Sequence, residues 1–225
     1  MRIDVLTLFP EMLEPLRTGI VGNALEKGLF QLNIVNFREY SSDKHHRVDD
    51  YSFGGGAGML IAPQSIAAAV RAVDPEHKAR RIYLSPRGRV FEQSVAKELV
   101  REDRLLFLCG SYEGVDQRVI DACFDDEISI GDYIMTSGEI GALAVINTVV
   151  RLIDGVLGSE ESLEVESFDD NLLEYPQYTR PAVWEGISVP EVLLSGNHAE
   201  VDKWRKEQRL KITQERRPDL LEKKK

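Results

Sequence analysis

The chain has 225 residues, a length that suits one medium domain or one domain with a small appendage. Its hydrophobic content of 43 % is enough for a core, while 29 % charged residues and the lack of any apolar run near the ~20 residues that span a bilayer argue against a membrane protein. The formal net charge of −10 argues against general binding of polyanions.

Short strand-like runs alternate with helix-like runs over the first two thirds of the chain. The first run ends at Pro10, too soon for a signal peptide with its cleavage site, so we expect a cytoplasmic protein. Strands are expected at 3–9, 31–37, 81–84, 105–109 and 128–134. Helices are expected at 11–28, 64–73, 91–101, 116–124 and 139–153, with a long glycine-rich loop at 38–59. This order predicts an α/β fold with a mostly parallel sheet covered by helices on both faces.

The alternation stops after residue 158. Residues 159–174 contain seven acidic residues and no basic one, which predicts a flexible acidic linker. The remainder is predicted to be helical, because SGNHAE resembles a capped helix start and Pro218 interrupts the pattern near the end. From Lys203 onward there are ten basic and four acidic residues, a net of +6, which leaves −16 for the rest of the chain. Such a tail fits localised phosphate contact and fits a solvated helix face equally well.

The cysteines and histidines give no sign of a metal or redox site. Cys109 and Cys123 lie in apolar stretches and form no Cys-x-x-Cys pair, so we expect buried free thiols. None of the four histidines has a partner four residues along the chain. We therefore expect no zinc site.

Four loops beside expected strands combine glycine with unusual polar sequences. They are YSFGGGAGM, YLSPRG, CGSYEGVDQR and IGDYIMTSGEIGA. Ligands of parallel α/β sheets bind beyond the carboxyl ends of the strands, although any one such glycine can also mark an ordinary tight turn. Because Met59 interrupts G-x-G-x-x-G and no P-loop motif exists, the common dinucleotide and P-loop sites are disfavoured. A cofactor held here would be bound largely through backbone groups, with its adenine in an apolar slot.

These loops, together with DDYSFGGGAGM, YPQYTRP and LLSGNHAEVDKWR, closely resemble segments of the bacterial tRNA (guanine-N1-)-methyltransferases, the TrmD family of the SPOUT class. The motifs occur in the family's order over residues 1–221. The resemblance implies a homodimer with its active site at the subunit interface. It divides the chain into a catalytic, cofactor-binding domain (1–158) with a deep trefoil knot at its C-terminal part, a flexible acidic linker (159–174) and a small helical tRNA-binding domain (175–225). The general rule that chains avoid knots would instead favour an ordinary doubly wound sheet.

The resemblance also implies the reaction and its cofactor. A methyl group passes from S-adenosylmethionine to N1 of guanine 37, beside the anticodon in the tRNA stem-loop, and gives m1G37. Mg²⁺ during catalysis is implied as well, although no ligand cluster for it is visible in the sequence. Matched motif by motif, the cofactor contacts fall on Tyr83, Leu84, Ser85, Pro86, Gly110, Tyr112, Glu113, Gly114, Ile130, Gly131, Asp132, Tyr133, Ile134 and Met135, with Gly138 and Ala142 leaving room for the adenosine.

Methylation at N1 of guanine needs a base and a stabilising cation. N1 carries a proton that must be removed, and negative charge then moves toward O6. A carboxylate suits the first task and an arginine the second. In the family, the arginine near the end of the long helix matches Arg151, and the aspartate that precedes Ser-Phe matches Glu166 here, a change of residue with the same chemistry. Asp169 is the second candidate for the base, and Asp170 lies equally close in sequence.

The tRNA contacts that the resemblance implies lie mainly in the basic tail. Asp50 is expected to touch the target base or the cofactor, or else to cap its own loop. The expected RNA contacts in the tail are His198, Lys203, Arg205, Lys206 and Arg209. Two other functions remain open from the sequence, a knotted methyltransferase that acts on ribose 2′-OH and a non-catalytic RNA-binding protein. A dehydrogenase is a remote third, because its fingerprint is missing.

Overall fold

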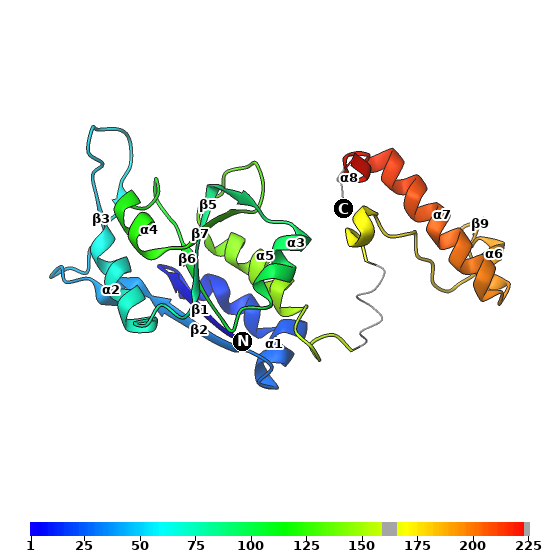
Figure 1. Ribbon diagram of the computed structural model, residues 1–225, viewed down its shortest axis with the longest axis horizontal. Coiled ribbons are helices and arrows are strands. Elements are labelled where there is room, and N and C mark those ends of the chain that lie inside the picture. The colour runs from blue at the N-terminus through cyan, green and yellow to red at the C-terminus, as the bar shows by residue number, and fades with distance from the viewer. Residues whose placement is uncertain (159–165, 223–225) are drawn as a thin grey trace. The chain divides into compact units, whose positions relative to one another are not determined.

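The computed structural model describes residues 1–158 and 166–222, with only the backbone of residue 169. The chain divides into two compact units, residues 1–158 and 159–225, and each is described by itself (Figure 1). In the described ranges, no helix combines the length and the apolar character needed to cross a membrane.

A five-stranded sheet forms the centre of the first unit, and all of its strand pairs are parallel. Across the sheet the strands lie in the order β2 (Gln31–Asn36), β1 (Arg2–Thr7), β6 (Arg104–Cys109), β5 (Arg80–Val90) and β7 (Asp126–Ser129). From its second residue onward, β6 is completely buried, as expected of a parallel strand covered on both faces. The mostly parallel α/β architecture predicted from the sequence is confirmed.

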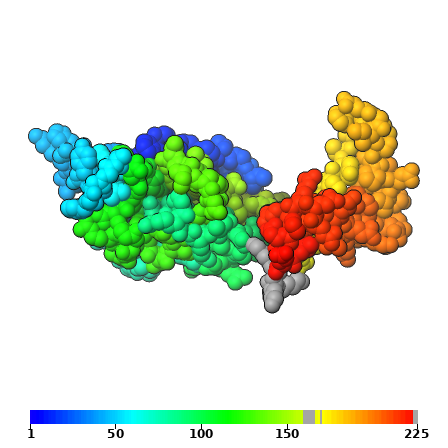
Figure 2. Space-filling view, turned by 90° about the horizontal axis from the view of Figure 1, so that it is seen from above, coloured from blue at the N-terminus to red at the C-terminus, as the bar shows by residue number. Residues whose placement is uncertain are grey.

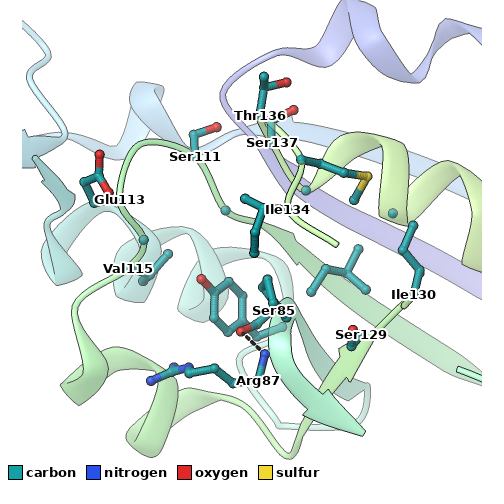
Figure 3. Close-up of a pocket in the computed structure, with 18 of the residues that line it drawn as sticks. Ser85, Arg87, Ser111, Glu113, Val115, Ser129, Ile130, Ile134, Thr136 and Ser137 are labelled. Carbon is teal, nitrogen blue, oxygen red and sulfur yellow. Dashed lines mark hydrogen bonds between the residues drawn. The ribbon is translucent and has the colours of Figure 1, made fainter. Parts of the chain in front are cut away.

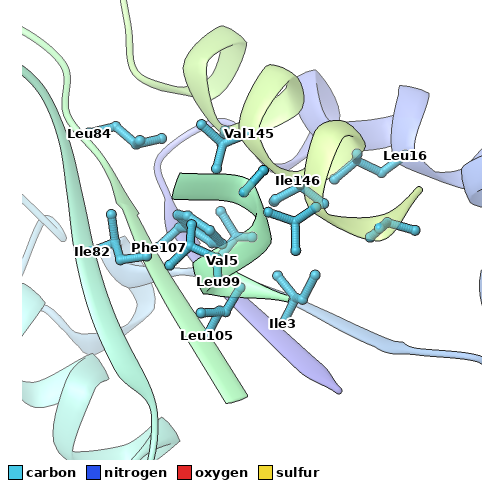
Figure 4. Packing of buried hydrophobic residues seen from close by; sticks show 14 of the residues in the cluster. Ile3, Val5, Leu16, Ile82, Leu84, Leu99, Leu105, Phe107, Val145 and Ile146 are labelled. Atoms are coloured by element: carbon cyan, nitrogen blue, oxygen red, sulfur yellow. The ribbon is translucent and has the colours of Figure 1, made fainter. Parts of the chain in front are cut away.

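Helices cover both faces of this sheet (Figure 1). On one face, Val5 and Phe107 pack in a buried cluster with Val145 (Figure 4). On the other face, the alternate residue Leu6 shares a second buried cluster with Ile66. The helices of the first cluster are α1 (Gly19–Glu26), α3 (Gln93–Leu99) and α5 (Glu139–Val150), and those of the second are α2 (Pro63–Val73) and α4 (Gln117–Cys123).

The prediction of one helix over 11–28 is wrong. The segment forms a 3₁₀-helix, Pro10–Arg17, followed by α1 after an extended residue at Thr18. Pro15 lies inside the first helix, where its ring removes a backbone donor. Gly19 then adopts a φ of 60°, in the left-handed region that glycine tolerates best. Both features interrupt a continuous α-helix.

Two predicted strand ends also differ from the structure. β5 does not end at residue 84 but continues to Val90, and its pairing with β7 shifts so that Leu84 and Arg89 both pair with Ile128. β7 ends at Ser129 instead of continuing to residue 134. Gly131, with a φ of 146°, begins a loop there. The apolar residues after β7 therefore belong to that loop and not to the sheet.

The glycine-rich segment stands out from the body of the first unit, as Figures 1 and 2 both show. It runs between two short antiparallel strands, β3 (Asp49–Asp50) and β4 (Leu60–Ile61), and a 3₁₀-helix, Phe37–Tyr40, precedes it. Tyr51 and Phe53 are 80 % and 99 % exposed. The loop predicted at 38–59 is thus largely confirmed, with short regular elements inside it.

The second unit centres on one long helix, α7 (His198–Arg216). Its predicted start is confirmed, because the Asn197 side chain accepts a hydrogen bond from the Glu200 backbone N–H, and it ends before Pro218 as predicted. Part of the predicted linker, 159–165, lies outside the described residues. The other elements of this unit are a 3₁₀-helix (Asp169–Asn171), β8 (Val183–Trp184), β9 (Ile187–Ser188), α6 (Glu191–Leu194) and α8 (Asp219–Glu222).

Candidate active site

A pocket of about 570 Å³ opens at the carboxyl ends of β6 and β7, beside the irregular middle of β5 (Figure 3). Its walls come from residues 83–87 within β5, from residues 110–117 after β6, and from residues 128–138 at the end of β7 and after it. They meet because β5 pairs with both β6 and β7 and all three strands point the same way. A volume of this size is typical of sites for small molecules and cofactors.

The pocket brings together most of the residues expected to contact a cofactor. Asp132 is exposed and does not line it, and Ala142 is completely buried behind the wall, where Gly141 lines the pocket instead. The expected residues that do line it are Tyr83, Leu84, Ser85, Pro86, Gly110, Tyr112, Glu113, Gly114, Ile130, Gly131, Tyr133, Ile134, Met135 and Gly138.

Sequence reasoning missed several further residues of the pocket wall. Most of them lie in the same glycine-containing motifs, so the motif boundaries were a usable signal for them. Leu60 lacked such a signal, because it follows the glycine-rich loop and reaches the pocket from a different part of the chain. The missed residues are Leu60, Arg87, Ser111, Val115, Gln117, Ile128, Ser129, Thr136, Ser137 and Gly141.

The end of the glycine-rich loop is fastened to the pocket wall by backbone hydrogen bonds. The Glu113 N–H donates to the Met59 carbonyl at 3.1 Å, and the Ile61 N–H donates to the Gly114 carbonyl at 2.9 Å. At Gly58, with a φ of 79°, a side chain would meet Cγ of Glu113 at 2.3 Å. Glycine is therefore required where the loop crosses Glu113. Of the loop and the strand that ends it, only Leu60 lines the pocket.

Polar groups in the wall are arranged to meet a ligand. The hydroxyl of Ser111 is buried and has no hydrogen-bond partner among the described residues. A buried hydroxyl without a partner costs free energy, so this group suits a bound molecule with a polar atom. Burial raises the pKa of Tyr83, which keeps its phenol neutral and able to donate a hydrogen bond. Ser85 Oγ accepts a hydrogen bond from the Arg87 N–H at 3.2 Å and holds the first loop in a turn (Figure 3).

Two glycines allow backbone segments to approach closely at the pocket. A Cβ at Gly138 would lie 2.8 Å from the Gly110 nitrogen, and the Gly138 N–H donates to the Gly110 carbonyl at 2.8 Å. A Cβ at Gly88 would lie 2.4 Å from the Ile128 nitrogen. Both obstacles are backbone atoms, so neither can be relieved by turning a side chain.

Gly138→Ala is expected to destabilise the first unit by about 1–3 kcal/mol, because the added methyl forces the backbone of 138 away from that of 110. Denaturant unfolding of the two proteins measures the difference. Gly158→Ala is the matched control, since no atom lies within 4 Å of a Cβ placed there. Equal stability of the two variants would contradict the close approach.

The candidate catalytic residues belong to different units. Arg151 is half-buried at the C-terminal cap of α5, where its N–H donates to the Asn147 carbonyl. Glu166 is half-buried in the second unit. The side chain of Asp169 lies outside the described residues, and Asp170 is exposed with a φ of 51°.

The residues expected to contact RNA are not equally available. His198, Lys203 and Lys206 are exposed on α7. The Arg205 guanidinium lies 5.0 Å from the centre of the Tyr175 ring and can still reach solvent at one side. Arg209 is only 9 % exposed, and its Nε donates to the carbonyl of Leu173. Asp50 is exposed, and its carboxylate accepts the Tyr51 N–H at 2.8 Å, as a loop-capping residue does.

The described part of the chain holds no cluster of metal-ligating side chains, and its two cysteines are free thiols. Among residues 1–158 and 166–222, no group of three or more His, Cys, Asp or Glu side chains could hold a metal ion. Cys109 is a buried free thiol, as predicted, and Cys123 is a half-buried one. Burial raises the pKa of Cys109 well above its ordinary value, so this thiol stays protonated.

The first unit thus has the architecture of an α/β enzyme that binds a small molecule at the carboxyl ends of parallel strands. Comparison with known proteins identifies the family. The family model described as tRNA (Guanine-1)-methyltransferase TrmD matches residues 1–223. The chain belongs to this family, as the motifs predicted, and it is a tRNA guanine-N1 methyltransferase.

Two curated relatives carry the same family description. The tRNA (guanine-N(1)-)-methyltransferase of Clostridium botulinum strain Hall is 54 % identical over 223 residues, which cover 99 % of this chain and 92 % of the relative. The tRNA (guanine-N(1)-)-methyltransferase of Clostridium perfringens strain 13 is 52 % identical, over 99 % of this chain and 94 % of the relative. The similarity therefore extends over both units.

Proposed function

We propose that this enzyme transfers the methyl group of S-adenosylmethionine to N1 of guanine 37, beside the anticodon of tRNA. Family membership supports the reaction, and the pocket beside β5, β6 and β7 supports a bound methyl donor. The observation that carries the proposal is the combination of the two: a methyltransferase of this family needs a donor site, and the motif residues converge on one pocket of suitable volume.

The pocket residues fit S-adenosylmethionine. Ile130, Ile134 and Met135 offer apolar surface for an adenine ring, and Gly110 and Gly131 expose backbone groups at the wall. The unpartnered hydroxyl of Ser111 suits a polar atom of the ligand. When bound, the donor supplies an electrophilic methyl group on a positively charged sulfur. The residues of the wall hold it in place and keep water away.

The chain's own residues provide the acid–base chemistry. The Glu166 carboxylate accepts the proton of guanine N1, which frees the lone pair for attack, and Asp169 is the second candidate for this role. The Arg151 guanidinium stabilises the negative charge that moves toward O6. Arginine suits this position because it stays protonated at any physiological pH. No role is assigned to Mg²⁺.

From the resemblance to the TrmD family, we propose that the site is completed in a homodimer at the subunit interface, with Arg151 and Glu166 contributed by different units. In this arrangement Glu166 of one protomer serves the pocket of its partner. Residues 1–158 then form the catalytic domain, 159–174 an acidic connection whose last part is bound to α7, and 175–225 a helical tRNA-binding domain. The elements α6, α7 and α8 of the second unit support the last assignment.

We further propose that the catalytic domain contains a deep trefoil knot. Two close approaches of backbone segments are compatible with it, at Gly88 against 127–128 and at Gly138 against 109–110. A segment threaded through a loop needs such places without side chains.

The exposed cations of α7 provide the proposed phosphate contacts. Lys203 and Lys206 lie three residues apart and share one exposed face of the helix. Lys206→Met is expected to weaken tRNA binding and to reduce the slope of log K against log salt by about one, because one phosphate contact is lost. Filter binding over a series of salt concentrations measures the slope. Lys27→Met, an exposed cation of the first unit, is the control that should keep the wild-type slope.

The product of the reaction tests the proposed function. The protein is incubated with S-adenosylmethionine and an unmodified tRNA transcript, and the modified nucleoside is identified and mapped by mass spectrometry. We expect 1-methylguanosine at position 37, and none in a transcript with adenosine there. A methyl group on ribose would favour the 2′-O-methyltransferase, and RNA binding without any product would favour the non-catalytic protein. Either result would overturn the proposal.

A further inference from the structure

A strap of residues 173–178 lies along α7 in the second unit. Its beginning is held by hydrogen bonds to the backbone of Leu173. Further along, the Tyr175 ring lies 5.0 Å from the Arg205 guanidinium. The Tyr178 and Trp204 rings then follow, with their centroids 6.4 Å apart. The strap thus runs antiparallel to the helix.

Leu173 makes two backbone hydrogen bonds to side chains of α7. Its backbone N–H donates to Oγ1 of Thr213 at 2.9 Å, and its carbonyl accepts a hydrogen bond from Nε of Arg209 at 3.3 Å. Thr213 Oγ1 also donates to the Arg209 carbonyl at 2.7 Å. The two side chains lie four residues apart, on one face of the helix. The backbone of Leu173 is therefore bound to α7 through both its N–H and its carbonyl.

These two polar side chains are buried. Thr213 is completely buried and Arg209 is 9 % exposed. Buried polar groups need partners, and Oγ1 of Thr213 and Nε of Arg209 find backbone atoms that any residue except proline would offer at position 173. The pair therefore fixes where the chain runs, whatever the side chain of residue 173. A phosphate contact by the same guanidinium would require it to leave this buried position.

The hydrogen bonds to Leu173 anchor a small closed loop that begins next to Glu166. The Phe168 N–H donates to the Leu172 carbonyl at 2.7 Å, and the Glu174 N–H donates to Oγ of Ser167 at 3.0 Å. Phe168 has a φ of 75°, in the left-handed region that costs energy for a large side chain. Such a conformation persists only where its surroundings hold it. The loop from Ser167 to Glu174 is thus closed on itself and then fastened to α7.

We propose that Arg209 and Thr213 are positioning residues for the methyl transfer. They attach the segment that carries Glu166 to α7, whose exposed Lys203 and Lys206 are the proposed phosphate contacts, so that the same helix holds a bound tRNA and the base. The inference rests on the proposed role of Glu166. It replaces the expected RNA contact of Arg209 with a contact inside the protein.

Thr213→Val tests the proposal, with Thr213→Ser as the conservative variant. Valine keeps the shape but removes both hydrogen bonds of the hydroxyl, whereas serine keeps them. We expect the Leu173 amide to exchange its hydrogen faster in Thr213→Val, and kcat for tRNA methylation to fall about 10- to 100-fold, because the base loses its defined position. The KM for S-adenosylmethionine should stay unchanged, and Thr213→Ser should restore both amide protection and kcat.

A second variant guards against a folding defect. Arg209→Met keeps the buried aliphatic length and removes the donor to Leu173, and we expect the same loss of kcat. Gln214→Ala changes an exposed, uncharged residue of the same helix and should behave as wild type. Normal kcat in both Thr213→Val and Arg209→Met, with Leu173 deprotected, would overturn the positioning role and leave the proposed function intact. Normal methylation by Glu166→Gln would instead refute the proposed function.

Discussion

Glu166→Gln is expected to lower methyl transfer by about 10²- to 10⁴-fold, because glutamine has the size of glutamate but cannot accept the N1 proton of guanine. Guanine N1 is a poor nucleophile while it keeps that proton. The pocket for the methyl donor lies in the first unit and Glu166 in the second, so the affinity for S-adenosylmethionine should not change. Single-turnover methylation and a calorimetric titration with S-adenosylmethionine measure the two quantities.

Two further variants decide whether the effect belongs to position 166. Glu207→Gln removes an exposed carboxylate from α7 and should leave the rate unchanged, which controls for a general change of charge near RNA. Asp169→Asn tests the second candidate. If Glu166→Gln turns over normally while Asp169→Asn does not, the role of the base passes to Asp169.

The sheet could be predicted because its strands are buried on both faces. A parallel strand such as 105–109 is an unbroken apolar run, and such runs stand out from a charged sequence. The same signal misled at 130–134, where Ile134 is apolar yet 82 % exposed. Ile134 lines the pocket and does not belong to the sheet. A short run of apolar residues looks the same in a strand and in a pocket wall, so the hydrophobic pattern alone cannot distinguish them.

The helix predicted at 11–28 failed for a local reason. Apolar spacing continues through Pro15 and Gly19, but a missing backbone donor and a left-handed φ end the α-helix all the same. Spacing reports which side of a segment is buried, and it does so for a 3₁₀-helix as well. The buried residues Leu13 and Leu16 belong to the same core cluster as Val21.

The pocket could be anticipated from glycine-containing loops at strand ends, but its finer details depend on orientation. Gly141 lines the pocket and Ala142 does not, because one residue along a helix turns the side chain by about 100°. Charge likewise cannot separate Lys206, which is exposed, from Arg209, which is buried three residues later. The difference in exposure depends on Leu173, more than thirty residues away in the sequence, whose carbonyl accepts a hydrogen bond from Nε of Arg209.

Arg151→Met is expected to lower methyl transfer by about 10²- to 10³-fold, with unchanged affinity for S-adenosylmethionine, because the charge developing toward O6 loses its stabilising cation. Methionine keeps much of the aliphatic packing of a half-buried arginine at the end of α5. Arg101→Met, an exposed arginine of the same unit, is the control. A near-normal rate in Arg151→Met would remove this residue from the mechanism.

Mixing the two inactive proteins tests whether each site draws on both protomers. If Arg151 and Glu166 of one site come from different protomers, a heterodimer of Arg151→Met with Glu166→Gln contains one site with both mutations and one with neither. Random exchange of subunits makes half of the dimers mixed, so about a quarter of the wild-type rate should return. If both residues came from the same protomer, every site in the mixture would carry one mutation and no activity would return. Neither variant alone has a complete site. Activity therefore returns in the mixture only if Arg151 and Glu166 of each site come from different protomers.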